Sequence, residues 1–291
     1  MPIGDHPSFD CPTVSQRLWR YVDLPKFIEL LISRKLWLTN AETLAVDDPH
    51  EGLQGALQFP HRLWRTVSDV PEILRKQIIA MRRNGSDQTD ERLFKGWFMV
   101  EEQRCHMTLS GRRNFFVNCW HAADHESAAM WKIYGSLAGG VAIVSTGGRL
   151  HAALAQASEE IYLGAVRYVD PRAFEIGARN AFDSLVSKRS AFAYEQEVRL
   201  VHWQRGHYHD PLSTFDWNEQ TMRFDNIVEN PNPITPGITV DCDLATMIEQ
   251  VLISPVAPTW YLSMIERLIE QLGFSFPVRQ SVLLKAPPTI E

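Results

Sequence analysis

Strand-like and helix-like segments are mixed along this chain without the strict alternation that a doubly wound parallel sheet requires. Short β-prone apolar runs predict strands, and apolar residues that recur every three or four positions predict helices. The mixture favours an α+β fold. The expected strands span residues 17–22, 36–38, 114–120, 140–145, 161–169, 194–203 and 250–253, with a closing apolar segment at 278–284. The expected helices follow residue 23 and lie within residues 70–104, 124–135, 171–188 and 258–272.

The length of 291 residues allows one large domain, and no internal repeat or low-complexity tract divides the chain. Residues 61–113 look mostly helical and hold 11 lysines and arginines against 7 aspartates and glutamates, in a chain of net charge −6. Such a segment could face a phosphate-bearing ligand, or it could be a solvated helical face of mixed charge. Residues 204–237 are polar and rich in proline and asparagine, which indicates a surface excursion. We therefore expect a single domain over residues 1–291.

The four cysteines show no C-x-x-C spacing, which is typical of free thiols in a reducing compartment. Residues 1–10 have neither the basic start nor the apolar stretch of a signal peptide. The longest apolar run without charge, near residues 135–148, is too short to cross a bilayer. We expect a cytoplasmic protein without a membrane partner.

The most informative constellation is the segment Tyr194–Arg199, which contains two glutamates two positions apart. On a strand, Glu195 and Glu197 would project from one face, with Arg199 following them. Adjacent like charges are unfavourable unless they are solvated or serve a ligand. A carboxylate pair suits chemistry at a sugar anomeric carbon, where one group stabilises the cationic transition state and the other directs the nucleophile. The alternative is a solvated strand face on which Arg199 pairs with the glutamates.

Two further features are candidates for ligand contacts. Arg20 lies in the apolar strand of residues 17–22 and needs a partner, either a structural carboxylate or a bound phosphate. Met130, Trp131 and Tyr134 are helical neighbours at spacings of three and four residues. Their aromatic face could stack on a flat ring such as nicotinamide or adenine, or it could belong to the core.

Several common sites are not indicated. His121 and His125 have i, i+4 spacing but lack the glutamate after the first histidine that the metalloprotease motif requires, so we expect no zinc site. The glycine pairs at 139–140 and 147–148 match neither a dinucleotide-binding motif nor a P-loop. No serine-centred nucleophile elbow is present.

In their order, these motifs resemble those of a widespread bacterial family of domains of unknown function. That family has an aromatic-Arg-Tyr strand, an Asn-Asp-Pro-Phe-Glu loop, a Cys-Phe-Ser strand, a Met-Trp-x-x-Tyr helix and a Tyr-Glu-x-Glu-Trp-Arg strand. The resemblance covers residues 17 to 284, with departures at Asp47, at Val198 and in the Asn-Cys-Trp strand. The matching stretches are Trp19–Tyr21, Asp47–Glu51, Asn118–His121, Met130–Tyr134 and Tyr194–Arg199.

The family in turn resembles a divergent branch of the ADP-ribosyltransferase superfamily. The resemblance implies a split, strongly twisted β core with surrounding helices, and NAD as the substrate. It implies that Arg20 contacts NAD, that Glu197 is the catalytic glutamate and that Glu195 orients the acceptor. The remaining residues expected to bind NAD are Tyr21, Asn118, Trp131 and Tyr134.

The implied activity is transfer of ADP-ribose to a macromolecule, protein or nucleic acid, as a toxin or phage-defence effector that a neutralising partner could accompany. A close variant hydrolyses NAD. A metal-dependent nuclease or phosphodiesterase is an alternative, and so is a non-enzymatic nucleic-acid-binding module that uses residues 61–113. The nuclease would place Mg²⁺ among Asp47, Asp48, Glu51, Glu195 and Glu197.

Overall fold

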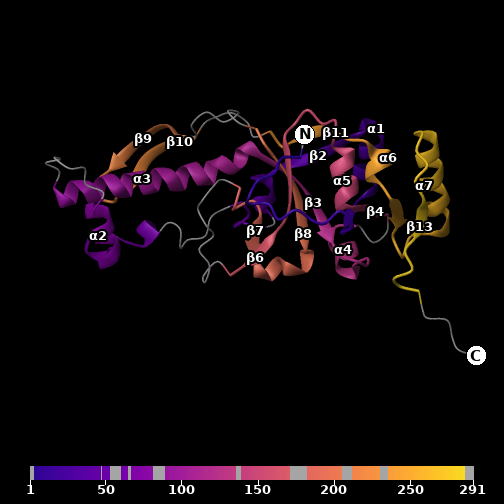
Figure 1. Cartoon of the computed structure of the whole chain (residues 1–291), viewed down its shortest axis with the longest axis horizontal. Helices are drawn as coiled ribbons and strands as arrows, with labels where there is room; N and C mark the ends of the chain where they lie inside the picture. Colours follow the sequence, from indigo (N-terminus) through magenta and orange to yellow (C-terminus); the bar gives the residue numbers. More distant parts are fainter. Residues whose placement is uncertain are drawn as a thin grey trace, which may run out of the picture.

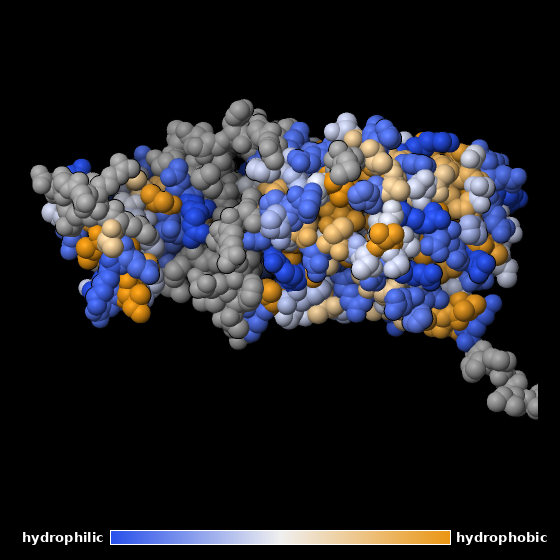
Figure 2. All heavy atoms as spheres, in the orientation of Figure 1, coloured by the Kyte–Doolittle hydropathy of each residue, from blue (hydrophilic) through white to orange (hydrophobic). Residues whose placement is uncertain are grey.

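Nine strands form one sheet of mixed direction in the computed structural model, and helices pack around it (Figure 1). This arrangement confirms the expected α+β class. None of the described helices is both long enough and apolar enough to span a membrane. Figure 2 shows hydrophilic residues over much of the visible face, with small hydrophobic patches between them. The structure describes residues 3–46, 48–52, 60–64, 67–80, 89–135, 139–170, 182–204, 212–229 and 235–285.

Neighbouring strands of the large sheet run antiparallel, except that β12 and β13 are parallel. Two further pairs lie outside this sheet: β6 with β7, and β9 with β10. The strands of the large sheet are β1 (Arg17–Val22), β2 (Lys35–Asn40), β3 (Phe115–Ala122), β4 (Val141–Thr146), β5 (Ile161–Ala165), β8 (Glu197–Trp203), β11 (Gly237–Asp241), β12 (Gln250–Ile253) and β13 (Val278–Gln280). The other strands are β6 (Arg167–Val169), β7 (Ser187–Arg189), β9 (Leu212–Asn218) and β10 (Arg223–Glu229).

The helices differ widely in length, and the shortest are single 3₁₀ turns. The described α-helices are α1 (Leu24–Ser33), α2 (Glu72–Ala80), α3 (Asp90–Gly111), α4 (Ala128–Ile133), α5 (Gly147–Ala153), α6 (Leu244–Met247) and α7 (Thr259–Gln271). The described 3₁₀ helices are η1 (Thr43–Val46), η3 (Pro60–Leu63), η4 (Val67–Asp69), η5 (Arg112–Asn114) and η6 (Ser190–Glu195).

Strands β1 and β2 both pair with the same edge of β3, and neither pairs with the middle of that edge. β1 pairs with the C-terminal end of β3, where Trp19 faces His121, and β2 pairs with the N-terminal end, where Thr39 faces Val117. Both strands are antiparallel to β3 and therefore parallel to each other, and α1 connects them. The sheet consequently divides along residues 118–120 of β3, for which neither β1 nor β2 supplies a paired residue.

Helix α1 covers this division from one side of the sheet. The side chain of Asp23 accepts the backbone N–H of Lys26, as expected of a helix cap. Phe27, Leu30 and Leu31 are buried in the main core, together with residues of α5, α6, α7 and the sheet. The helix therefore forms where the local sequence predicts it, and its apolar face fixes it against the divided sheet.

Helix α3 extends away from the sheet, with the β9–β10 pair along one side and α2 on the other (Figure 1). Phe94 and Phe98 of α3 form a separate core there with Ile78 of α2 and Met222. The described part of the polar segment 204–237 thus includes two strands. Several cations of the basic segment have acidic partners, namely Arg62, Lys76, Lys95, Arg104, Arg112 and Arg113. This pairing fits a helical face of mixed charge.

Three predicted elements differ from the observed ones. The helix expected at residues 171–188 lies outside the described residues up to residue 181, and its end forms β7 instead. The strand expected at 161–169 is two strands, β5 and β6, which belong to different sheets. The strand expected from residue 194 begins only at Glu197.

Candidate functional site

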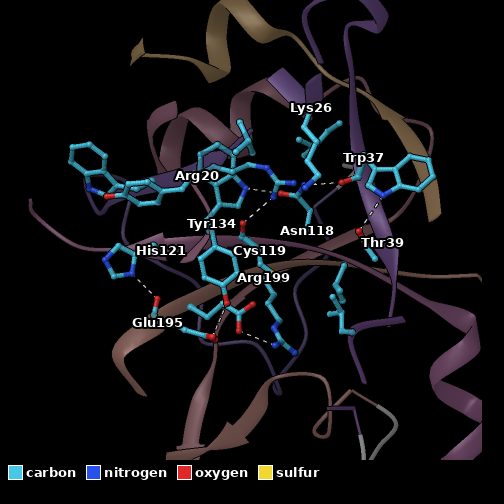
Figure 3. Close-up of a pocket in the computed structure, with 18 of the residues that line it drawn as sticks. Arg20, Lys26, Trp37, Thr39, Asn118, Cys119, His121, Tyr134, Glu195 and Arg199 are labelled. Carbon is cyan, nitrogen blue, oxygen red and sulfur yellow. Dashed lines mark hydrogen bonds and ion pairs between the residues drawn. The ribbon is translucent and has the colours of Figure 1, made fainter. Parts of the chain in front are cut away.

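A cavity of about 1000 Å³ lies where β1 and β2 diverge from each other along β3. Its lining comes from α1, β1, β2, η1, β3, α4, β7, η6, β8 and β11, and from the segment that holds Asp48 and Glu51. Neither β1 nor β2 pairs with the middle of β3, so the cavity reaches both faces of the sheet there. Its lining therefore includes neighbouring β3 residues whose side chains point to opposite faces. Figure 3 shows Arg20 and Asn118 in the upper part of the cavity and Glu195 and Arg199 in the lower part, with Tyr134 reaching towards Glu195.

Three carboxylates and two cations form a buried charge cluster in the lower part. Arg199 donates to Glu51 at 2.6 Å and to Glu197 at 2.8 Å. The Nζ of Lys188 lies 2.5 Å from Glu195, 3.5 Å from Glu51 and 3.6 Å from Glu197. None of the five side chains is more than 10% exposed. With all five groups ionised, the cluster keeps one negative charge in excess.

The cations hold Glu197 in its ionised form. Burial by itself would raise the pKa of Glu197, but Arg199 and Lys188 outweigh burial and lower that pKa to about 2. Burial would lower the pKa values of Lys188 and Arg199, but Glu197 and Glu51 raise both. Glu197 is therefore a carboxylate at neutral pH, although it is almost fully buried.

The expectation that Glu195 and Glu197 project from one strand is wrong. Glu195 ends the 3₁₀ helix η6, and Gln196 adopts a left-handed backbone conformation with φ of 41° before β8 begins. The two carboxylates approach each other through Lys188 and not through strand periodicity. The alternative is confirmed in one part, because Arg199 pairs with Glu197 at 2.8 Å. It is wrong in the other, because Glu195, Glu197 and Arg199 are buried and do not form a solvated face.

Tyr134 and His121 hold Glu195 in place. The Tyr134 hydroxyl donates to the Glu195 carboxylate at 2.8 Å, and His121 Nδ1 donates to the Glu195 backbone carbonyl at 2.6 Å. Burial, followed by the hydrogen bond to Glu195, raises the pKa of Tyr134, so this hydroxyl keeps its proton. Tyr134 lines the cavity and is 43% exposed, so its ring is accessible to a flat ligand.

Arg20 reaches the same cavity from β1. Its Nη1 donates to the backbone carbonyl of Cys119 at 2.9 Å, and within the described part of the chain no carboxylate lies at ion-pair distance from it. Burial lowers the pKa of Arg20, but a guanidinium still remains protonated at neutral pH. Among the described residues, Arg20 therefore does not form the structural ion pair that was one of its two expected partnerships. Its other donors are available to a ligand.

The other expected contact residues play different structural parts. Asn118 spans the division, because its amide donates to the Trp37 carbonyl at 2.7 Å and accepts from the indole of Trp120 at 2.8 Å. Tyr21 lines the cavity. Trp131 is buried in a small core cluster, where its ring meets that of Tyr21 edge-on at 5.1 Å. Trp131 thus supports the lining of the cavity without belonging to it.

The carboxylates that would bind Mg²⁺ in a nuclease are occupied by cations. Asp48 accepts from Arg189 at 2.6 Å, and Glu51 accepts from Arg199. The described residues contain no group of three histidine, cysteine, aspartate or glutamate side chains that could hold a metal ion. Asp47 lies outside the described residues. The geometry thus gives the metal-dependent alternative no support.

Two residues of the site were not expected from the sequence. The Tyr168 hydroxyl accepts the backbone N–H of Glu197 at 2.8 Å and so fixes the start of β8. The indole of Trp37 forms part of the cavity wall on β2. The available sequence signal was a tryptophan at an exposed position of a strand, because an exposed ring contributes little to the stability of the fold.

Comparison with known proteins does not assign the chain. No protein-family model matches it, and searches of the curated proteins and of the solved structures find no match either.

Proposed function

We propose that this protein binds NAD in the cavity, breaks the bond between nicotinamide and ribose, and passes ADP-ribose to a macromolecule or to water. One observation carries the proposal. Arg20, which has no described acidic partner, lines the same cavity as Glu195 and Glu197, although they lie far apart in the sequence. A lone guanidinium suits a diphosphate, and a buried carboxylate pair suits a ribose.

The dimensions of the site support this ligand class. Small-molecule pockets commonly measure about 300–1,000 Å³, so a cavity at the upper end of that range has room for a dinucleotide. The divided sheet, with Arg20 beside the division and Glu197 at the start of β8, agrees with the split core that the resemblance to ADP-ribosyltransferases implies.

The proposed chemistry follows from the charges of the lining. When the glycosidic C–N bond breaks, nicotinamide leaves with the bonding electron pair and positive charge develops on the ribose. Glu197, ionised and held by Arg199, lies in a low-dielectric site where a carboxylate stabilises that charge strongly. The acceptor oxygen or nitrogen then attacks the ribose carbon and loses its proton to solvent water, and Glu195 orients the acceptor. Arg20 holds the diphosphate throughout.

Thermal unfolding in EDTA tests directly whether the protein binds NAD or a metal ion. NAD at 100 times its Kd is expected to stabilise the fold by about 2.7 kcal/mol without metal, whereas Mg²⁺ alone is expected to have no effect. Arg20→Gln should abolish most of this shift. Arg17→Gln is the matched control, because Arg17 lies on the same strand but does not line the cavity. A shift that requires Mg²⁺, or equal shifts for the two variants, would contradict the proposal.

A further inference from the structure

Trp37 is an exposed tryptophan in the wall of the cavity. Three tryptophans belong to the described lining: Trp19 and Trp120 are 5% and 1% exposed, whereas Trp37 is 44% exposed. A large aromatic ring that is left exposed in a cavity wall is accessible to a ligand. It could be an isolated surface residue, but its surroundings indicate that its orientation is specified.

Two contacts fix the Trp37 ring. Its indole Nε1 donates to the hydroxyl of Thr39 at 3.1 Å. Gly237 of the neighbouring strand β11 lies against the ring, since a Cβ on Gly237 would come within 2.2 Å of the indole Cζ2. A side chain at position 237 would therefore displace the ring. The glycine and the hydroxyl together hold an exposed indole in a defined position, which lowers the entropic cost of stacking a ligand on it.

The position of Trp37 relative to the charged groups suggests which part of a ligand it meets. In Figure 3, Arg20 lies between Trp37 on one side and Tyr134 with Glu195 on the other. The backbone of Trp37 is tied to the same division of the sheet, because its carbonyl accepts from Asn118. The lining therefore includes an exposed ring, a guanidinium and a carboxylate cluster.

We propose that Trp37 is the stacking platform for the adenine base of the dinucleotide. The assignment rests on the proposed function for the other half of the ligand. With the nicotinamide ribose at Glu197 and the diphosphate at Arg20, the adenosine half extends towards β2. Every purine has a flat π-face, and stacking on an aromatic side chain requires no base-specific hydrogen bond. Trp37 therefore selects for a nucleotide with a flat base and does not take part in bond cleavage.

Calorimetric titration of the full chain with AMP, nicotinamide mononucleotide and NAD tests this assignment. Trp37→Ala is expected to weaken the binding of AMP and NAD by about tenfold or more, which is the scale of stacking one base on an aromatic ring. The affinity for nicotinamide mononucleotide should stay within about twofold of the wild type. Trp37→Phe should recover part of the loss. Trp260→Ala is the matched control, because Trp260 on α7 is also exposed but lies outside the cavity lining.

The outcomes separate this assignment from the proposed function. NAD binding by both the wild type and Trp37→Ala with the same Kd overturns the stacking role and leaves the proposed function intact. Equal losses of affinity for AMP and for nicotinamide mononucleotide also overturn it, because they indicate a structural role for the ring. AMP binding that depends on Trp37, in a protein that does not bind NAD, supports the platform and overturns the proposed function. A wild type that binds neither AMP nor NAD overturns both.

Discussion

Replacing Glu197 with glutamine tests whether the charge cluster holds this carboxylate in its ionised form. The pKa of Glu197 falls from an ordinary 4.5 to about 2 in the folded protein. At about 1.4 kcal/mol per pKa unit, ionised Glu197 contributes about 3 kcal/mol to the free energy of unfolding at pH 7. Because the folded pKa is the lower one, this contribution is complete above pH 4.5 and is lost as the pH falls towards 2. Glutamine resembles the protonated acid and lacks the contribution at every pH.

Urea unfolding of the wild type and Glu197→Gln at pH 7 and pH 3 measures the effect. The difference in unfolding free energy should be about 3 kcal/mol at pH 7 and about 1 kcal/mol at pH 3. Glu266→Gln, which changes an exposed glutamate of α7, should stay within about 0.5 kcal/mol of the wild type. The same difference at both pH values, or no difference at pH 7, would refute the argument that Arg199 and Lys188 lower this pKa.

Three further substitutions probe other parts of the site. Arg199→Met removes the one cation that hydrogen-bonds both Glu51 and Glu197 and leaves them buried beside Lys188 alone, so urea unfolding should show a loss of roughly 3–5 kcal/mol, and a loss below about 1 kcal/mol would argue against the cluster as described. Tyr134→Phe removes the 2.8 Å hydrogen bond to Glu195 but keeps the ring, so calorimetry should find NAD affinity within about twofold and unfolding should show a loss of about 1 kcal/mol. Glu195→Gln should reduce transfer of labelled ADP-ribose while slow NAD hydrolysis continues; side-by-side assays of NAD consumption and labelled acceptor check this, and undiminished transfer would count against a role in orienting the acceptor.

Local sequence signals predict the elements that position the site. The capping carboxylate of Asp23 and the apolar face of α1 are local features, and both are found as expected. The strand that carries Arg20 is also observed with the expected bounds. These predictions succeed because hydrogen bonds and burial within a few residues determine them.

The charge cluster as a whole could not be predicted, because Glu51 reaches Arg199 and Lys188 only through long-range pairing. Glu51 and Arg199 are brought together by the fold, and Lys188 joins them from β7. Strand periodicity fails for Glu195 because Gln196 takes a left-handed conformation that is uncommon for residues other than glycine. Helical spacing identifies the aromatic face of α4, but the docking of the helix decides that Trp131 is core.

The site's proposed chemistry is tested most directly by mass spectrometry of isotopically labelled NAD incubated with the purified protein and a cell extract. We predict release of nicotinamide and appearance of labelled ADP-ribose, free or attached to a macromolecule. Folded Glu197→Gln should bind NAD but cleave it about 100-fold more slowly, the scale of losing one preorganised electrostatic group, whereas Arg17→Gln should match the wild type. Absence of nicotinamide release by the wild type, or wild-type rates from folded Glu197→Gln, would contradict the account.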